Sequence, residues 1–83
     1  MNLLYFAWVR SHIGHGEEQL TPPPDVTTVE ALRVWLCAQS PGHAQALGTP
    51  ERLRVAVNQA YVGWTHPITP QDEIAFFPPV TGG

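Results

Sequence analysis

The sequence predicts a single α+β domain in which a helix packs on a β-sheet. Segments rich in aromatic and β-branched residues lie near both ends and in the second half of the chain, at 3–10, 54–57, 61–62 and 74–77, which is typical of strands. Between them, residues 29–36 carry apolar side chains at helical spacing. A chain of 83 residues buries only about 60% of its unfolded surface, so it can form one hydrophobic core.

The first strand is predicted at residues 3–10, where Arg10-Ser11 end an apolar run. Side chains alternate along a strand, which gives Leu3, Tyr5, Ala7 and Val9 on one face and Leu4, Phe6 and Trp8 on the other. Because both sets are apolar, we expect both faces of this strand to be covered. A turn at 12–16 is expected to lead into a short antiparallel strand at 17–20.

The main helix is predicted to start after the proline-rich loop 21–25. Thr27 and Glu30 match a capping box, in which the threonine hydroxyl accepts from the Glu30 amide and the Glu30 carboxylate reaches back. Ser40-Pro41-Gly42 is expected to end this helix. A short turn of helix is expected at 43–47, closed by Gly48.

The faces of the main helix follow from its apolar stripe. Val29, Leu32 and Leu36 recur at helical spacing and are expected to pack on the sheet. Glu30 and Arg33 lie one turn apart, on the side that we expect to be exposed. The single cysteine in this helix, Cys37, has no histidine at a recognisable nucleophile spacing, so it is interpreted as a buried or half-buried filler.

The second half of the chain predicts a hairpin and a final strand. Residues 54–57 alternate like a strand, Asn58-Gln59 forms a turn, and 61–62 give a brief partner strand. In the last strand, 74–77, adjacent side chains face opposite sides. We therefore assign Phe76 to the core and Phe77 to the outer face, beside Phe6 on the neighbouring strand.

The C-terminal tail is the most informative segment. Pro78 and Pro79 fix φ and remove two backbone donors, so the last strand must stop near Phe77 and the tail must leave the sheet. Gly82-Gly83 then places the terminal carboxylate on a residue without a side chain, which can enter a narrow slot. We expect a folded domain at 1–77 and a flexible tail at 78–83.

Composition excludes several classes of function. Four basic and seven acidic residues give a net charge of −3, which provides no footprint for nucleic acid or an anionic membrane. The basic residues are all arginines, so the chain cannot join its tail to a side-chain amine of its own. A single cysteine excludes an internal disulfide, and the first residues lack the basic segment of a secretion signal, so we expect a cytoplasmic protein.

No catalytic or metal-binding constellation is visible in the sequence. His12 and His15 have no further ligands beside them and are interpreted as solvated loop residues. The sequence shows no nucleophile with its base and no phosphate-binding glycine loop, so we expect no metal, no cofactor and activation from outside.

Several segments resemble a known family. Residues 73–83, Glu-Ile-Ala-Phe-Phe-Pro-Pro-Val-Thr-Gly-Gly, are similar to the C-terminus of the small subunit of molybdopterin synthase, a ubiquitin-like sulfur carrier. Residues 4–10, 28–32 and 55–59 resemble the first strand, helix start and middle strand of that family. The resemblance implies a β-grasp fold with a mixed sheet, in which the terminal strands lie parallel in the centre and the helix covers one face.

The resemblance also implies a function. An ATP-dependent activating enzyme adenylates the Gly83 carboxylate, and a sulfur donor protein then supplies sulfur to form a thiocarboxylate. The loaded tail enters the large subunit of molybdopterin synthase, within an expected heterotetramer, and gives sulfur to cyclic pyranopterin monophosphate to build the dithiolene of molybdopterin. The residues expected to contact partners are Gly82, Thr81, Val80, Pro79, Pro78, Phe77 and Phe6.

Three alternatives remain open from the sequence. The sulfur carrier for thiamine thiazole synthesis has the same fold and a Gly-Gly end, although the run Phe76–Pro79 favours the molybdopterin family. A ubiquitin-like modifier would instead be found joined to lysines of other proteins. A plain interaction module that used only Pro78-Pro79 would leave Gly82 and Gly83 unexplained.

Overall fold

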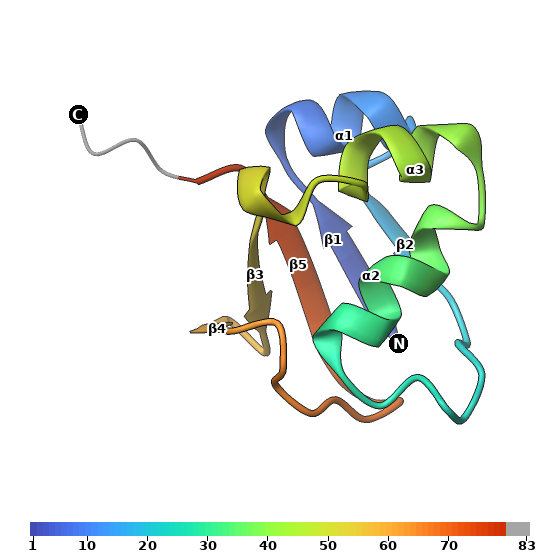
Figure 1. Ribbon diagram of the computed structural model, residues 1–83, viewed down its shortest axis with the longest axis vertical. Coiled ribbons are helices and arrows are strands. Elements are labelled where there is room, and N and C mark those ends of the chain that lie inside the picture. Colours follow the sequence, from blue (N-terminus) through green and yellow to red (C-terminus); the bar gives the residue numbers. More distant parts are fainter. Residues whose placement is uncertain (80–83) are drawn as a thin grey trace.

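The computed structural model describes residues 1–79 of the 83. It forms one mixed sheet with helices on one side (Figure 1). The elements in chain order are β1 (Asn2–Tyr5), α1 (Ala7–Ile13), β2 (Glu17–Gln19), α2 (Val29–Cys37), α3 (Pro41–Leu47), the 3₁₀ turn η1 (Pro50–Arg52), β3 (Arg54–Val57), β4 (Ala60–Val62) and β5 (Glu73–Phe77).

The sheet has the predicted β-grasp topology. Its strand order is β2-β1-β5-β3-β4, so the first and last strands lie side by side in the centre. They run parallel, with Leu3 opposite Ile74 and Tyr5 opposite Phe76, whereas the outer pairs are antiparallel. The fold class is confirmed, and the last strand, β5, lies in the middle of the sheet rather than at an edge.

The first strand is shorter than the sequence predicts. β1 ends at Tyr5, and α1 follows from Ala7 to Ile13. The prediction of a strand over 3–10 is therefore wrong after Tyr5. The backbone amides of Val9 and Arg10 donate to the carbonyl of Phe6 at 3.1 and 3.5 Å, which closes the first turns. The alternation of apolar residues in this stretch is also compatible with a helix that buries Val9 on the sheet.

The expected turn at 12–16 is replaced in part by the end of this helix. Gly14 has φ of 103° and donates its backbone N–H to the Arg10 carbonyl at 2.8 Å. A left-handed glycine just after the last turn is a common way to end a helix. The antiparallel strand predicted next is confirmed as β2.

The main helix α2 is confirmed, with a different cap. Thr28, not Thr27, precedes the helix, and its hydroxyl accepts from the Ala31 amide at 3.2 Å. The Glu30 carboxylate does not reach back to the cap, because it accepts from Arg33 Nε at 2.6 Å. Arg33 is buried and donates to the Leu47 carbonyl at 2.8 Å, so the expected exposed position for Arg33 is wrong.

Two further helices share the face covered by α2. Ser40 caps α3, which starts at Pro41, two residues before the turn of helix predicted at 43–47. The helices α1 and α3 pack so closely that a side chain on Gly42 would collide with the carbonyl of His12. The longest helix in residues 1–79 is α2 with nine residues, and no helix in that range is long and apolar enough to cross a membrane.

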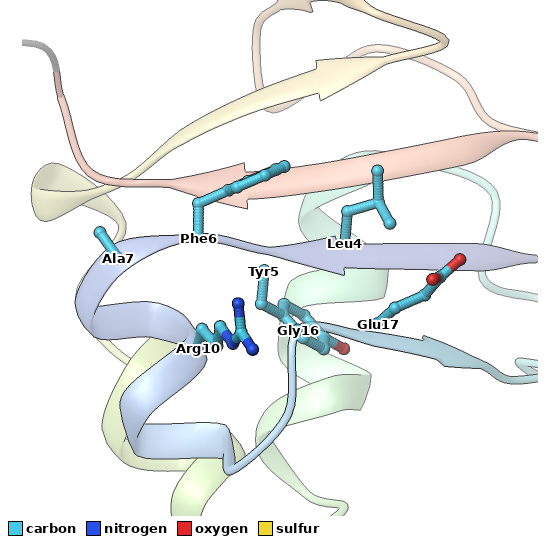
Figure 2. Close-up of a pocket in the computed structure, with 7 residues that line it drawn as sticks. All are labelled: Leu4, Tyr5, Phe6, Ala7, Arg10, Gly16 and Glu17. Carbon is cyan, nitrogen blue, oxygen red and sulfur yellow. The ribbon is translucent and has the colours of Figure 1, made fainter.

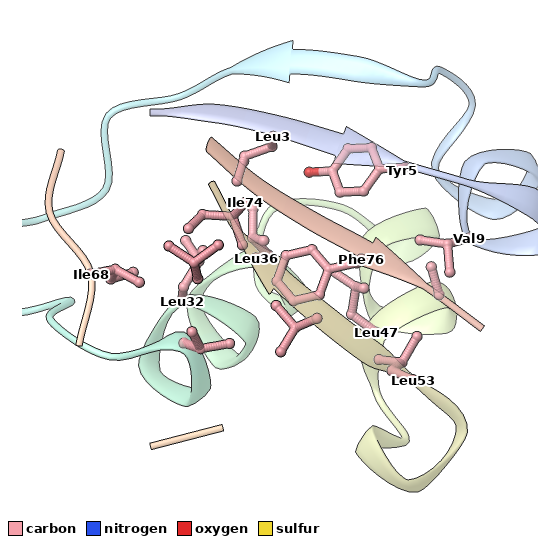
Figure 3. Close-up of a cluster of buried hydrophobic side chains, with 14 residues drawn as sticks. Leu3, Tyr5, Val9, Leu32, Leu36, Leu47, Leu53, Ile68, Ile74 and Phe76 are labelled. Carbon is pink, nitrogen blue, oxygen red and sulfur yellow. The ribbon is translucent and has the colours of Figure 1, made fainter. Parts of the chain in front are cut away.

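The hydrophobic core lies between these helices and one face of the sheet (Figure 3). The stripe predicted on α2 is confirmed, since Val29, Leu32 and Leu36 are all 0% exposed. The buried residues of the core are Leu3, Tyr5, Val9, Val29, Leu32, Leu36, Ala46, Leu47, Leu53, Val55, Val57, Ile68, Ile74 and Phe76. Each strand of the centre contributes alternate residues, so the core takes only one face of the sheet.

A polar cluster borders this core where β1, β2 and α3 meet. Glu18 accepts from the Tyr5 hydroxyl at 2.6 Å, and its carboxylate lies 2.7 Å from His43 Nε2 and 3.1 Å from His15 Nε2. His43 Nδ1 is 2.7 Å from the Ser40 hydroxyl. Burial raises the pKa of Glu18, but the hydrogen bonds from Tyr5, His43 and His15 lower it by more, so the carboxyl pKa lies below its ordinary value. The cluster therefore fixes α3 to the β2 edge.

No helix in residues 1–79 covers the other face of the sheet (Figure 1). Leu4, Ala75, Ala56 and Tyr61 form a row across four strands, because each is paired with the next. Phe6 and Phe77 follow one step further along the strands. The expectation that both faces of the first strand are covered is wrong for this chain alone, since Phe6 is 50% exposed.

Candidate functional site

The candidate site is the end of the sheet from which the tail departs. β5 stops at Phe77, whose last pairing partner is Arg54 on β3. Pro78 and Pro79 are half-buried and lie outside any strand. They have no backbone N–H to donate, so strand pairing ends before them. The predicted site residues Val80, Thr81, Gly82 and Gly83 lie outside the described residues, and their roles remain predictions.

Three aromatic side chains surround this exit on the open face. We call Phe6, Tyr61 and Phe77 the aromatic patch. Phe6 is 50% and Tyr61 is 74% exposed, and the rings of Tyr61 and Phe77 lie 5.3 Å apart between centroids. A monomer rarely leaves such large apolar groups together in water without a partner.

The sequence assigned Phe76 and Phe77 to opposite faces, and the structure confirms this. Phe76 is 0% exposed and stacks between Tyr5 and Trp64, at 6.4 Å from each ring. Phe77 is half-buried on the other face. The ring that packs against Phe77 is Tyr61, which the sequence analysis did not single out, because the contact joins β4 to β5 across β3.

The backbone holds Phe6 at the rim of the exit. Its amide donates to the Phe76 carbonyl at 3.3 Å, so Phe6 continues the parallel pairing beyond Tyr5. The next residue, Ala7, has φ of 55°, a left-handed conformation that is uncommon for a residue with a side chain. This bend turns the chain into α1 and leaves the Phe6 ring on the sheet surface.

A shallow pocket of about 410 Å³ opens beside Phe6. Figure 2 shows its walls, with Leu4 on β1, Phe6 just after the end of β1, and the Arg10 side chain on α1. Gly16 allows this, because a Cβ there would lie 3.2 Å from Arg10 Nε. The pocket therefore combines an apolar wall with one cation, Arg10, and one carboxylate, Glu17.

The cysteine is not equipped as a nucleophile. Cys37 is half-buried on α2, and burial raises the pKa of its thiol. A thiol of raised pKa stays protonated at neutral pH and is a weak nucleophile. The half-burial of Cys37 confirms this part of its interpretation as a buried or half-buried filler.

Comparison with known proteins identifies the family. The model of the ThiS family matches residues 3–83. The chain belongs to the ThiS family. Among characterised relatives, it is 47% identical to the molybdopterin synthase sulfur carrier subunit of Escherichia coli and 42% identical to that of Haemophilus influenzae, in each case over all of this chain and 99% of the relative.

Solved structures agree with this ThiS-family fold. The crystal structure of SAMP1 from Haloferax volcanii has a TM-score of 0.78, covers 100% of this chain and is itself covered to 98%. Its sequence identity of 22% supports the shared fold alone. The β-grasp architecture predicted from the sequence is therefore confirmed by an independent likeness.

The ThiS-family match also covers residues 80–83, which lie outside the described part of the chain. It includes Gly82 and Gly83 as well as the aromatic run that precedes them. Of the predicted site residues, the structure brings Phe6, Phe77, Pro78 and Pro79 to one end of the sheet. Tyr61, beside Phe77, and Arg10, beside Phe6, also belong to the candidate site, and the sequence did not predict them.

Proposed function

We propose that this chain is the sulfur carrier subunit of a molybdopterin synthase. The observation that carries the proposal is the end-to-end similarity, at 47% and 42% identity, to two molybdopterin synthase sulfur carrier subunits. The end of β5 supports it, because Phe77 belongs to an aromatic patch with the exposed Phe6 and Tyr61, and Pro78 and Pro79 follow it directly. The thiamine thiazole and protein-modifier alternatives are not favoured, since neither relative carries such a name.

The chemistry resides in the Gly83 carboxylate. A free carboxylate is a poor electrophile, whereas its mixed anhydride with AMP has a good leaving group. An ATP-dependent activating enzyme would form that anhydride, and a sulfur donor protein would convert it to a thiocarboxylate. The thioacid is ionised at neutral pH and presents a nucleophilic sulfur to cyclic pyranopterin monophosphate. An activating partner that consumes ATP would act in the cytoplasm, which is the location we propose for this chain.

The folded domain supplies docking rather than catalysis. Phe6, Phe77 and Tyr61 form the surface that the large subunit would cover, as aromatic anchors do in protein interfaces. Residues 78–83 would cross from that surface into the large subunit, and six extended residues reach on the order of 20 Å. Gly82 and Gly83 would pass the narrowest part of the slot, because they have no side chains.

Intact mass tests the loading step. The chain purified from its own cells, or incubated with the activating enzyme, ATP and a sulfur donor, is expected to gain the mass difference between one sulfur and one oxygen atom. A variant extended by one alanine after Gly83 is the matched control, and it should fold normally but stay unmodified. An unmodified natural chain in cells that make molybdopterin, or an untrimmed extended chain that supports molybdopterin formation, would contradict the proposal.

A further inference from the structure

The exposed positive charge of this chain is concentrated at the tail exit. Of the four arginines, Arg33 is buried and paired with Glu30. The other three are exposed. Within residues 1–79 none of these three forms an ion pair, since the ion pairs there use His15, His43 and Arg33. We call Arg10, Arg52 and Arg54 the arginine collar.

The fold brings the collar together from distant parts of the sequence. Arg54 is paired with Phe77, the last residue of β5. Arg52 lies on η1, with its guanidinium carbon 5.2 Å from the centre of the Trp8 ring on α1. Arg10 lies one turn after Phe6, and its amide donates to the Phe6 carbonyl. Figure 1 shows α1 and η1 at the same end of the sheet as the end of β5.

The acidic residues are distributed differently. Asp72 and Glu73 lie at the start of β5, and the Asn2 amide donates to the Asp72 carbonyl, so they occupy the end of the sheet opposite the tail. Glu30 lies in the first turn of α2, and its amide donates to the Trp64 carbonyl. Two acidic residues do lie near the collar, because Glu51 precedes Arg52 on η1 and Glu17 lines the pocket beside Arg10. The tail end of the sheet thus carries three arginines with two glutamates, whereas Asp72 and Glu73 at the other end form no ion pair within residues 1–79.

The collar does not have the form of a phosphate site. Each guanidinium is held by a different element: Arg52 over Trp8, Arg54 by a 2.7 Å hydrogen bond to the Leu53 carbonyl, and Arg10 above Gly16. They therefore flank the aromatic patch instead of converging on one anion. Arginine and aromatic residues are the types enriched in the contact surfaces between proteins.

We propose that the arginine collar docks on an acidic rim around the slot of the large subunit that receives the tail. The proposal rests on the proposed function, because it takes the large subunit as the partner of the aromatic patch. Complementary charge at the edge of an apolar contact raises the association rate and orients the encounter. Here it would align the tail with its slot before the aromatic contacts form.

The test is stopped-flow association of the full chain with the large subunit at low and high salt. At about 50 mM salt, where charges act over longer distances, the combined variant Arg10→Gln, Arg52→Gln, Arg54→Gln is expected to associate at least roughly tenfold more slowly than the natural chain. At high salt the two rates should converge. The corresponding triple Arg→Lys variant keeps the charge and should retain the natural rate, which separates charge from packing.

A matched control places the same charge change at the other end. Gln71 is exposed in the turn before β5, so Gln71→Glu and Arg52→Gln each add one negative unit to the net charge. Gln71→Glu should leave the association rate unchanged, whereas Arg52→Gln should slow it by about threefold. Equal effects of the two would overturn the proposal, because net charge rather than the collar would then be responsible.

Two other results would also overturn it. One is a natural rate that does not depend on salt and is unchanged in the triple Arg→Gln variant, although binding and tail loading remain normal. The second is binding of inorganic pyrophosphate to the isolated chain with chemical-shift changes at all three arginine side chains, which would make the collar an anion site. Failure of the natural chain to bind the large subunit at any salt concentration would instead reject the proposed function and the collar together.

Discussion

The two faces of the sheet differ in what completes them. The inner face is filled by helices of the same chain, and Leu3, Ile74 and Phe76 are fully buried there. The outer face presents Phe6 and Tyr61 to solvent, with small alanines between them on the central strands. The same five strands thus make one surface for folding and another that we propose for association, and adjacent residues of β5 belong to different surfaces. Substitutions on the two faces should therefore fail in different assays.

The largest expected effect is on the inner face. Phe76→Ala should lower the free energy of unfolding by about 3 to 5 kcal/mol, because it removes a buried aromatic ring from the centre of the core. Chemical denaturation of the variant and the natural chain measures the difference. A loss below about 1 kcal/mol would mean that Phe76 is not a principal core residue.

The adjacent substitution on the outer face should act on binding. Phe77→Ala should weaken binding to the large subunit by roughly 2 kcal/mol, as the loss of an aromatic anchor does. Its cost in folding should be about 1 kcal/mol, the size of its contact with Tyr61. Titration calorimetry and denaturation on the same preparation decide this, and a variant that binds normally contradicts the division between the faces.

The polar cluster of the inner face should make stability depend on pH. Because the folded-state pKa of Glu18 is lowered, its contribution is present above the ordinary glutamate pKa of about 4.3. That contribution is lost as the pH falls below this value towards the folded-state pKa. Glu18→Gln should cost about 1 to 3 kcal/mol at pH 7, and its difference from the natural chain should shrink below pH 4. Denaturation at several pH values tests this, and a difference that is constant with pH would refute it.

The smallest effect is expected at the most exposed member of the outer face. Tyr61→Ala should lower the free energy of unfolding by no more than about 1 kcal/mol, the size of its contact with Phe77, because the side chain is otherwise 74% exposed. It should still weaken binding to the large subunit if the aromatic patch is the docking surface. Thermal unfolding and the same calorimetric titration provide the two measurements, with Val34→Ala, exposed on α2, as a control that should affect neither.

Local patterns predicted much of the fold. The stripe on α2, the alternation of Phe76 and Phe77, and the turn at Asn58-Gln59 depend on neighbouring residues, and all are present in the structure. The boundary between β1 and α1 was missed because apolar residues at 7–9 suit either a strand or a helix. The choice depends on the bend at Ala7, which the pairing of Phe6 with Phe76 holds in place.

Contacts between distant segments could not be predicted. The approach of Glu18 to His43 and the packing of Tyr61 on Phe77 require the strand order and the position of α3. The arginine collar also depends on the strand order. Its members lie at one end of the sheet only because β1 and β3 both flank β5. In contrast, the tail was informative from the sequence alone, since its chemistry depends on residue type rather than on neighbours.

The central position of β5 has a mechanical consequence. A force applied to the tail acts along a strand that is bonded to β1 on one side and β3 on the other. Such a load is shared in shear by both rows of hydrogen bonds, whereas a tail on an edge strand would load one row alone. Single-molecule pulling between residue 1 and the C-terminus should therefore give a higher unfolding force than pulling between residues 55 and 62, which are paired on β3 and β4 and would separate bond by bond. A partner that grips the chain end can thus draw on it while the domain stays intact.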